Sequence, residues 1–262
     1  AIHLFLPCAR HGHTREPIIH NRTVSAAICA WRDVDIDLRT MPELPEVETI
    51  RRAIEPRIVG ASITDIVVSD ASIALPESPD ALRAAVGATV RAVLRRGKHL
   101  ILLLAGNSGV VIHLRMTGAL YLCEPPEGTR IRATLVFSNG ERLVFTDTRR
   151  LGKLQFHQSL KPLLLGLGQE PLDSDFTADS LNESLRRHRI PVKAALLDQH
   201  TLAGVGNMYA DEALYLAGLN PLLPANELQP GQVRALWSAI RNVLQRAIDS
   251  GGATISTYAQ PD

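Results

Sequence analysis

The first regular pattern of apolar and polar positions along the chain begins at Pro45. Apolar residues then recur at intervals of three and four, at Val47, Ile50, Ile54 and Ile58. This spacing places the four side chains on one face of a helix, and proline is favoured in the first turn of a helix. The pattern therefore predicts a helix that begins near Pro45 and buries one side.

Short segments rich in Val, Ile and Leu follow, and this composition is typical of strands. They are Ile63–Ser69, Thr89–Leu94, His99–Leu104, Val110–Leu114, Ile131–Phe137 and Arg142–Thr146. Asn139-Gly140 separates the last two and is a strong signal for a two-residue hairpin turn. Ser78-Pro79 is typical of a helix start and predicts a short helix over Asp80–Val86. These elements predict an antiparallel β-sandwich or barrel with helices attached.

The pattern becomes helical past about Phe156. Helices are predicted over Ala178–His188, Val192–Gln199, Asn207–Ala217 and Gln232–Asp249. The last of them carries a continuous apolar stripe, as expected for a helix packed on a core. We therefore predict an α+β protein with an N-terminal antiparallel β-sandwich domain over residues 42–160, a linker over 161–175 and an all-helical domain over 176–262.

Composition narrows the class of protein. The 262 residues are enough for two domains, and 45% hydrophobic with 21% charged residues is ordinary for a globular chain. No apolar run is long enough to cross a membrane. Three cysteines without paired spacing favour a reducing compartment over a disulfide framework. From Pro42 onward basic and acidic residues are equal in number, so only local clusters such as Arg95, Arg96 and Lys98 weakly indicate a nucleic-acid partner.

Residues 1–41 show neither a sustained period nor the features of a targeting signal, since a basic start is lacking and acidic residues are present. Cys8, His11 and His13 lie close together in this segment. A zinc site needs four converging ligands, so scattered residues are the better interpretation. We expect residues 1–41 to be a leader that is disordered or an artefact of the gene record.

Seven motifs between Met41 and the end of the sequence carry a more specific signal. They are PELPEVET (Pro42–Thr49), RRGKHL (Arg95–Leu100), HLRMTG (His113–Gly118), TDTRRLG (Thr146–Gly152), PVKAALLDQ (Pro191–Gln199), AGVGNMYADEAL (Ala203–Leu214) and GGATISTY (Gly251–Tyr258). In this order and spacing they resemble the formamidopyrimidine-DNA glycosylase / endonuclease VIII family. PELPEVET and GGATISTY favour the formamidopyrimidine-DNA glycosylase branch.

The resemblance implies a catalytic set around the first motif. The family's nucleophile is the secondary amine of an amino-terminal proline, which corresponds to Pro42; such an amine can attack the sugar C1′ and form a Schiff base. Glu43 corresponds to the acid–base residue, whose carboxyl can protonate the sugar ring oxygen. Lys98 corresponds to a lysine that contacts the damaged strand as a point charge. Because the Pro42 nitrogen is acylated by Met41 in this sequence, we expect the active form to begin at Pro42.

Further residues are assigned by the same resemblance. Glu46 and Glu212 correspond to buried carboxylates that position the active site. Lys193 corresponds to a second lysine that contacts the damaged strand. Gly206 and Asn207 belong to the turn of a helix–two-turn–helix element, where free N–H groups of the following helix suit a phosphate. We expect Asn207 to cap that helix and to bind phosphate.

Three positions match the side chains that fill the gap left by a flipped base. A base inside a duplex must be extruded before an enzyme can act on it. The resemblance assigns the filling role to Met116, Arg149 and Leu151, with Arg149 facing the orphaned cytosine and the apolar pair wedging between base steps. Leu151 stands where the family commonly has Phe. Leu stacks on bases less well than Phe, so we expect the search for damage or the choice of opposite base to differ from that of other members.

Two features concern the end of the sequence. Tyr258 lies in a motif that resembles the loop closing over the flipped base. The family continues into a four-cysteine zinc finger, whereas this sequence has no cysteine after Cys123. We therefore expect no metal and no other cofactor in this chain.

The resemblance as a whole implies a bifunctional DNA glycosylase and AP lyase of base-excision repair. It would remove 8-oxoguanine and formamidopyrimidines from damaged double-stranded DNA bound between the two domains, and then cleave the strand by β,δ-elimination. We expect a cytoplasmic, nucleoid-associated monomer with no membrane partner. The alternatives are an endonuclease VIII-type enzyme for oxidised pyrimidines and an inactive remnant that binds damaged DNA. An RNA-binding module is a third, which would leave PELPEVET unexplained.

Overall fold

The computed structural model describes residues 42–252, except Leu75, Glu77 and Cys123. The described residues belong to one structural unit. The predictions for the leader and for Tyr258 lie outside the described residues. No helix within the described part of the chain is both long and apolar enough to span a membrane.

Helix α1 (Leu44–Ile58) starts where the apolar pattern predicts it, with Pro45 in its first turn. The backbone N–H of Glu43, the residue before the helix, donates to Glu46 Oε2 at 2.9 Å and so satisfies a donor that the helix itself leaves unpaired. Val47, Ile54 and Ile58 are buried on the predicted face. The helix lies against β2 (Ala92–Arg96) and β3 (His99–Leu103) and also contacts α7 (Pro230–Asp249) of the helical half.

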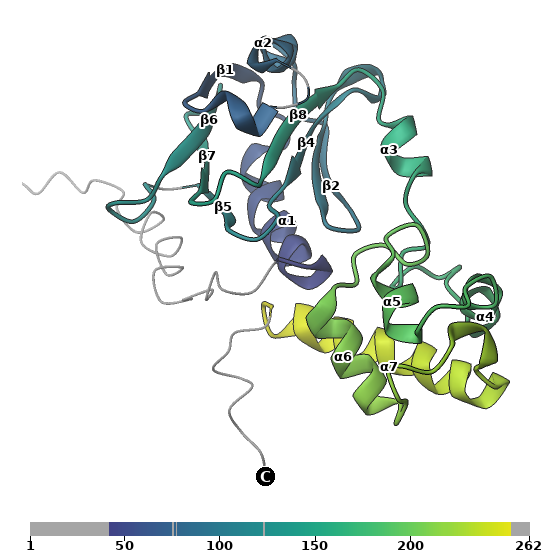
Figure 1. Ribbon diagram of the computed structural model, residues 1–262. Helices are drawn as coiled ribbons and strands as arrows, with labels where there is room; N and C mark the ends of the chain where they lie inside the picture. The colour runs from purple at the N-terminus through teal and green to yellow at the C-terminus, as the bar shows by residue number, and fades with distance from the viewer. Residues whose placement is uncertain (1–41, 75, 77, 123, 253–262) are drawn as a thin grey trace, which may run out of the picture. The chain divides into compact units, whose positions relative to one another are not determined.

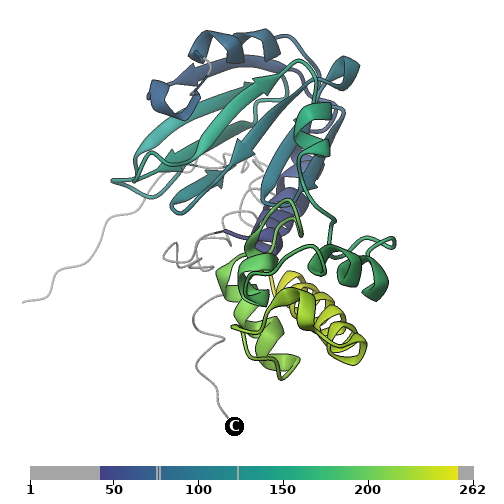
Figure 2. The same cartoon turned by 45° about the vertical axis from the view of Figure 1, so that its right-hand side comes forward.

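The strands form two antiparallel four-stranded sheets (Figure 1). The first sheet has the order β1 (Ile63–Val68), β6 (Ile131–Phe137), β7 (Arg142–Asp147) and β5 (Gly118–Tyr121). The second has the order β2 (Ala92–Arg96), β3 (His99–Leu103), β4 (Gly109–His113) and β8 (Lys153–His157). Apolar side chains from both sheets share one core, and Figure 2 shows the two layers from the side. The predicted sandwich and the α+β class are confirmed.

The sequence pattern missed or shifted several elements. β5 and β8 were not predicted. Each lies at the edge of its sheet, is only four or five residues long and has a single buried residue, Gly118 or Leu154. The strand expected from Thr89 begins only at Ala92, and Thr89 forms an isolated bridge with Ser62. The helix expected over 80–86 is a short α2 (Pro79–Leu82) continued by the 3₁₀ helix η3 (Arg83–Ala85).

Three short helices fall outside the predicted elements of the sandwich half. They are the 3₁₀ helices η2 (Ala71–Ala74) and η4 (Ala105–Asn107), and α3 (Lys161–Leu165), which lies in the predicted linker. The Asn139-Gly140 hairpin is present between β6 and β7, and Gly140 has a φ of 88°. This left-handed value is the one that favours glycine in such a turn.

The helical half contains all four predicted helices. They are α4 (Ala178–Leu185), α5 (Val192–Leu197), α6 (Asn207–Leu216) and α7 (Pro230–Asp249), with the 3₁₀ helix η5 (Ala225–Glu227) between the last two. They surround a second core that is separate from the sandwich core. Leu44, the first residue of α1, belongs to this second core, whereas Val47 belongs to the first. The start of α1 is therefore the point where the two cores adjoin.

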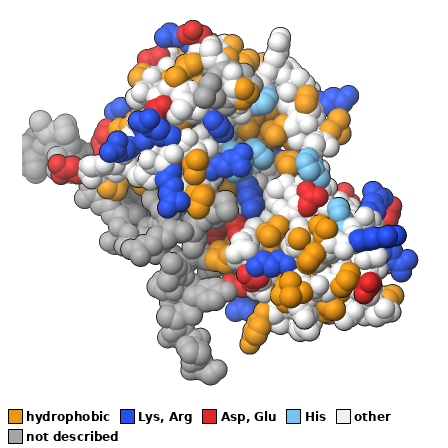
Figure 3. Space-filling view, viewed as in Figure 1, with side chains coloured by type: hydrophobic (Ala, Val, Ile, Leu, Met, Phe, Trp, Pro, Cys, Tyr) orange, Lys and Arg blue, Asp and Glu red, His pale blue; other side chains and the backbone are white. Residues whose placement is uncertain are grey.

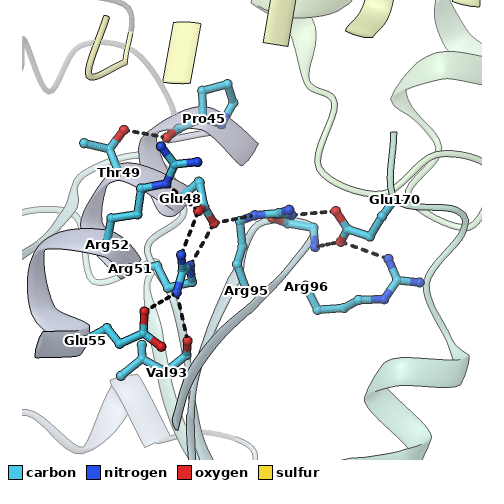
Figure 4. A network of polar contacts seen from close by, with 11 residues as sticks. Pro45, Glu48, Thr49, Arg51, Arg52, Glu55, Val93, Arg95, Arg96 and Glu170 are labelled. Atoms are coloured by element: carbon cyan, nitrogen blue, oxygen red, sulfur yellow. Dashed lines mark hydrogen bonds and ion pairs between the residues drawn. The ribbon is translucent and has the colours of Figure 1, made fainter. Parts of the chain in front are cut away.

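A buried ionic network joins α1, β2 and the segment after α3 (Figure 4). Glu48 on α1 accepts hydrogen bonds from Arg51, Arg52 and Arg95, and Arg95 also donates to Glu170 Oε2 at 2.6 Å. The side chains of Arg95 and Glu170 are only 11% and 7% exposed. Since each carboxylate is shared among several guanidinium groups, the network keeps these charges paired out of water.

Candidate active site

The carboxyl group of Glu43 lies where the second and third residues of the PELPEVET motif contact the glycine turn before α6. Its Oε2 accepts the backbone N–H of Gly206 at 2.5 Å, and its Oε1 accepts that of Met208 at 3.1 Å. Both donors are free because the first N–H groups of a helix have no partner within it. Leu44 N–H in turn donates to the carbonyl oxygen of Gly204 at 3.1 Å. The beginning of α1 and the beginning of α6 are thus joined through three hydrogen bonds.

Burial raises the pKa of Glu43 to about 7, against the opposing effects of Lys98 and of the two backbone N–H groups. Glu43 itself is only 2% exposed. A carboxyl group with such a pKa holds its proton until near neutrality and can release it there, which is the property a general acid needs. Pro42 is buried beside it.

Lys98 completes the charged part of this site. It is the second residue of the tight turn between β2 and β3, in which Gly97 has a φ of 56°. A Cβ atom placed on Gly206 would collide with both the Glu43 carboxyl and the Lys98 amine, so these two groups adjoin the same glycine. Burial lowers the pKa of Lys98, while Glu43 and Glu46 raise it. The structure therefore brings Pro42, Glu43, Lys98 and Gly206 together from distant parts of the sequence.

Glu46 lies behind this group and is held on both sides. Its Oε2 accepts the Glu43 N–H, and its Oε1 accepts the hydroxyl of Tyr209 at 2.6 Å. Burial and the neighbouring carboxylates raise the pKa of Tyr209, which keeps the hydroxyl protonated as a donor. Tyr209 was not among the predicted residues, although it stands inside the AGVGNMYADEAL motif. Glu212 is half-buried rather than buried, and it adds to the negative field at Tyr209.

The expected capping role of Asn207 is wrong. Gly206 occupies the N-cap position of α6, and Asn207 is the first helical residue, with an exposed side chain. The side chain that satisfies the first N–H groups comes from Glu43, far away in the sequence. Lys193 on α5 is paired with Asp211 on α6, with 2.7 Å between Nζ and Oδ1.

The three residues matched to gap filling all project from the surface. Met116 and Leu151 are 39% and 43% exposed, and Arg149 is also exposed. Arg149 Nη1 lies 3.9 Å from Met116 Sδ. Core filling, the ordinary role of Met and Leu, is therefore excluded for these two side chains. Figure 3 shows Lys and Arg side chains with hydrophobic ones between them on the face that bears β5 and β7.

The loop that carries Arg149 and Leu151 is organised by Asp147, which is 1% exposed. Its carboxylate accepts the Thr117 hydroxyl, the Arg149 N–H at 3.0 Å and the Gly152 N–H at 2.7 Å. These bonds tie the loop after β7 to the loop that carries Met116. Asp147 was not predicted, although its place in TDTRRLG gave a signal.

Two stacked histidines lie next to Lys98 and were also not predicted. The rings of His99 and His113 meet edge to face, with 4.6 Å between the ring centroids. Burial lowers the pKa of His99 to about 4 and that of His113 to about 3. His113 Nδ1 accepts the Arg115 N–H at 3.1 Å, so a neutral His113 carries its proton on Nε2. Both rings are therefore neutral at physiological pH.

Within residues 42–252 and outside the three undescribed positions, no group of three or more His, Cys, Asp or Glu side chains could hold a metal ion. The zinc that the resemblance associates with a four-cysteine finger is accordingly assigned to none of these residues.

Comparison with known proteins agrees with this geometry. The family model for the formamidopyrimidine-DNA glycosylase N-terminal domain matches residues 41–154, and the model for the H2TH (helix–two-turn–helix) domain of the same enzymes matches residues 167–259. The chain belongs to the formamidopyrimidine-DNA glycosylase family. The first match contains Pro42, Glu43 and Lys98, and the second contains Lys193 and the Gly206 turn.

Individual members of the formamidopyrimidine-DNA glycosylase family are closely similar along most of the chain. The formamidopyrimidine-DNA glycosylase of Chloroflexus aurantiacus is 44% identical over 223 residues, which cover 83% of this chain and 80% of the relative. That of Thermus thermophilus is 43% identical over 228 residues, covering 85% and 82%.

Solved structures of the family show the same fold. The crystal structure of the Thermus thermophilus protein matches with a TM-score of 0.72 and 41% identity, covering 81% of this chain and 78% of the other. The Lactococcus lactis formamidopyrimidine-DNA glycosylase, non-covalently bound to DNA with an abasic site, matches with a TM-score of 0.74 and 34% identity, covering 82% and 85%.

Proposed function

We propose that this protein is a bifunctional DNA glycosylase and AP lyase that removes oxidised purines, 8-oxoguanine and formamidopyrimidines, from double-stranded DNA. The observation that carries the proposal is the placement of Glu43. Its carboxyl lies beside Pro42 and Lys98, buried enough to hold a proton near neutral pH. Family membership supports the repair role, and the Lactococcus lactis relative bound to abasic DNA supports the substrate class.

The residues suit a reaction through a Schiff base on the Pro42 amine. The amine lone pair attacks the sugar C1′, the bond between C1′ and the base breaks, and the base leaves with the electron pair and takes up the proton that the amine loses. Glu43 then donates its proton to the sugar ring oxygen as the bond between C1′ and that oxygen breaks, and the nitrogen lone pair forms the iminium with C1′. The resulting carboxylate is stabilised by Lys98 and by the N–H groups of Gly206 and Met208. It then moves protons during β,δ-elimination.

Recognition of the substrate is assigned to the exposed group of Met116, Arg149 and Leu151. The two apolar side chains enter the stack that the flipped base leaves, and Arg149 meets the acceptor atoms of the opposite cytosine. Lys193 and the exposed side chain of Asn207, the first residue of α6, bind phosphates of the damaged strand. We propose that the enzyme acts as a monomer on chromosomal DNA in the cytoplasm.

Borohydride trapping on duplex DNA with an abasic site tests the nucleophile. In the 1–262 chain the Pro42 nitrogen belongs to a peptide bond and its lone pair is delocalised, so it cannot form an iminium. A chain that begins at Pro42 is expected to give a covalent adduct, whereas the 1–262 chain, confirmed intact by mass, gives none. Equal trapping of the two chains would show that Pro42 is not the nucleophile. An inactive remnant would trap in neither form.

A further inference from the structure

Asp70, in the turn after β1, is built into a set of contacts that the chemistry of Glu43 does not use. Its Oδ1 accepts the N–H and the hydroxyl of Ser72 at 3.1 and 2.7 Å, which fixes the carboxyl on its own turn. Its Oδ2 lies 3.0 Å from Arg132 Nη1 and 3.0 Å from Arg150 Nε. The arrangement holds Arg132, on β6, and Arg150, in the loop between β7 and β8, on one carboxylate oxygen.

The contact with Arg132 is buried and leads to the loop between β7 and β8. The side chains of Arg132 and Asp70 are 7% and 16% exposed. The Asp70 N–H donates back to the Arg132 carbonyl oxygen at 3.3 Å. Arg132 Nε donates to the carbonyl oxygen of Asp147 at 2.6 Å, and the Asp147 carboxylate holds the loop backbone at Arg149 and Gly152. Asp70 is therefore linked through Arg132 to the base of the loop that presents Arg149.

The contact with Arg150 reaches the same loop at its tip. Arg150 has a φ of 60°, a left-handed conformation that a residue with a side chain adopts only when surrounding contacts hold it there. It stands between Arg149 and Leu151, so a change in its backbone conformation would redirect both side chains. On the far side of the loop, Lys153 Nζ donates to the Ser72 carbonyl oxygen at 3.0 Å. The turn that bears Asp70 thus holds the loop at both ends.

We propose that Asp70 is a positioning residue for lesion recognition, which holds Arg150 and thereby sets the direction of Arg149 and Leu151 toward the base opposite the lesion. The proposal rests on the proposed function, because it assigns opposite-base reading to Arg149. Asp70 carries a negative charge into a basic surface that would meet phosphates. The ion pair between Asp70 and Arg150 therefore lowers the affinity for DNA and increases discrimination between bases opposite the lesion.

The test compares single-turnover excision of 8-oxoguanine opposite cytosine and opposite adenine, in chains that begin at Pro42. Asp70→Asn keeps an oxygen for the Ser72 contacts and removes the charge. Its ratio of the two rates is expected to fall by about two- to fivefold, the range of an exposed ion pair. Binding to undamaged duplex is expected to be as tight as in the wild type or tighter, whereas a merely destabilised protein would bind more weakly.

Asp65→Asn is the matched control, since Asp65 is an exposed aspartate on β1 whose Oδ1 accepts the N–H of the neighbouring Ile66 at 2.8 Å. It should leave the ratio unchanged. A double-mutant cycle with Arg150→Ala separates a route through Arg150 from a general effect. In the Arg150→Ala background, Asp70→Asn should no longer change the ratio.

An unchanged ratio in Asp70→Asn, an equal loss in Asp65→Asn, or an undiminished effect in the Arg150→Ala background would each overturn the role of Asp70. Absence of excision by the wild-type chain would instead refute the proposed function, and the two failures are therefore distinguishable.

Discussion

Replacement of Glu43 by Gln tests the environment of the carboxyl that we propose as the general acid most directly. The change keeps the size of the side chain and removes its titration. Because burial raises the pKa of Glu43 from its ordinary value of 4.5 to about 7, ionisation of the folded protein is penalised. One pKa unit corresponds to about 1.4 kcal/mol, so the interval corresponds to about 3 kcal/mol of folding free energy.

The direction follows from the two pKa values. Between pH 4.5 and about 7 the unfolded chain loses this proton while the folded chain keeps it, so ionisation stabilises the unfolded state. The contribution of Glu43 to stability is therefore complete below pH 4.5 and is lost as the pH rises to about 7. The stability of Glu43→Gln does not fall in this way as the pH rises. The substitution has a cost in stability of its own, because the Gln amide has one acceptor oxygen for the two N–H donors of Gly206 and Met208. This cost is independent of pH, because the Gln amide does not titrate.

The assay is urea unfolding of both proteins from pH 4 to pH 8. The free energy of unfolding of Glu43→Gln, relative to the wild type, should rise by about 3 kcal/mol across this range. In parallel, the variant should keep its affinity for lesion-bearing duplex and lose excision. Wild-type excision should slow as the pH rises through about 7, where the proton of Glu43 is lost. Glu183→Gln, on the exposed surface of α4, is the control for removal of a carboxylate.

A difference in unfolding free energy that stays flat with pH would show that Glu43 is ionised throughout, and the assignment of a raised pKa would be wrong. Wild-type excision rates in Glu43→Gln would refute its role as the acid.

Two further predictions concern other parts of the molecule. Arg149→Ala should weaken discrimination for cytosine opposite the lesion by about 1–3 kcal/mol, the scale of a good bidentate base contact, and an unchanged opposite-base profile would contradict this. Glu170→Gln should destabilise the fold by about 3–5 kcal/mol in urea unfolding, because the partly buried Arg96 would lose its carboxylate partner and Arg95 would retain Glu48 without Glu170. Glu183 has a side chain that is 73% exposed. A loss of unfolding free energy in Glu170→Gln no larger than that in Glu183→Gln would show that the ion pairs of Glu170 contribute little to stability.

Local patterns along the sequence were sufficient for the elements with strong periodicity. The apolar spacing after Pro45 and the Asn139-Gly140 turn each place one element correctly, because both depend on neighbours within a few residues. Local patterns did not lead us to predict β5 and β8. Each of the two is four or five residues long and lies at the edge of its sheet, so its position is fixed by the one neighbouring strand with which it pairs.

The motifs around Pro42, Lys98 and Arg149 identify the candidate site residues from the order of amino acids alone. The chemistry available to those residues depends on their surroundings in the folded chain. The pKa of Glu43 depends on its burial between α1 and α6, and capping of α6 falls to Glu43 and not to Asn207. The solvation and the hydrogen-bond partners of Glu43 are set by segments far apart in the chain. Their effects on its pKa therefore arise only in the folded protein, where the two cores adjoin.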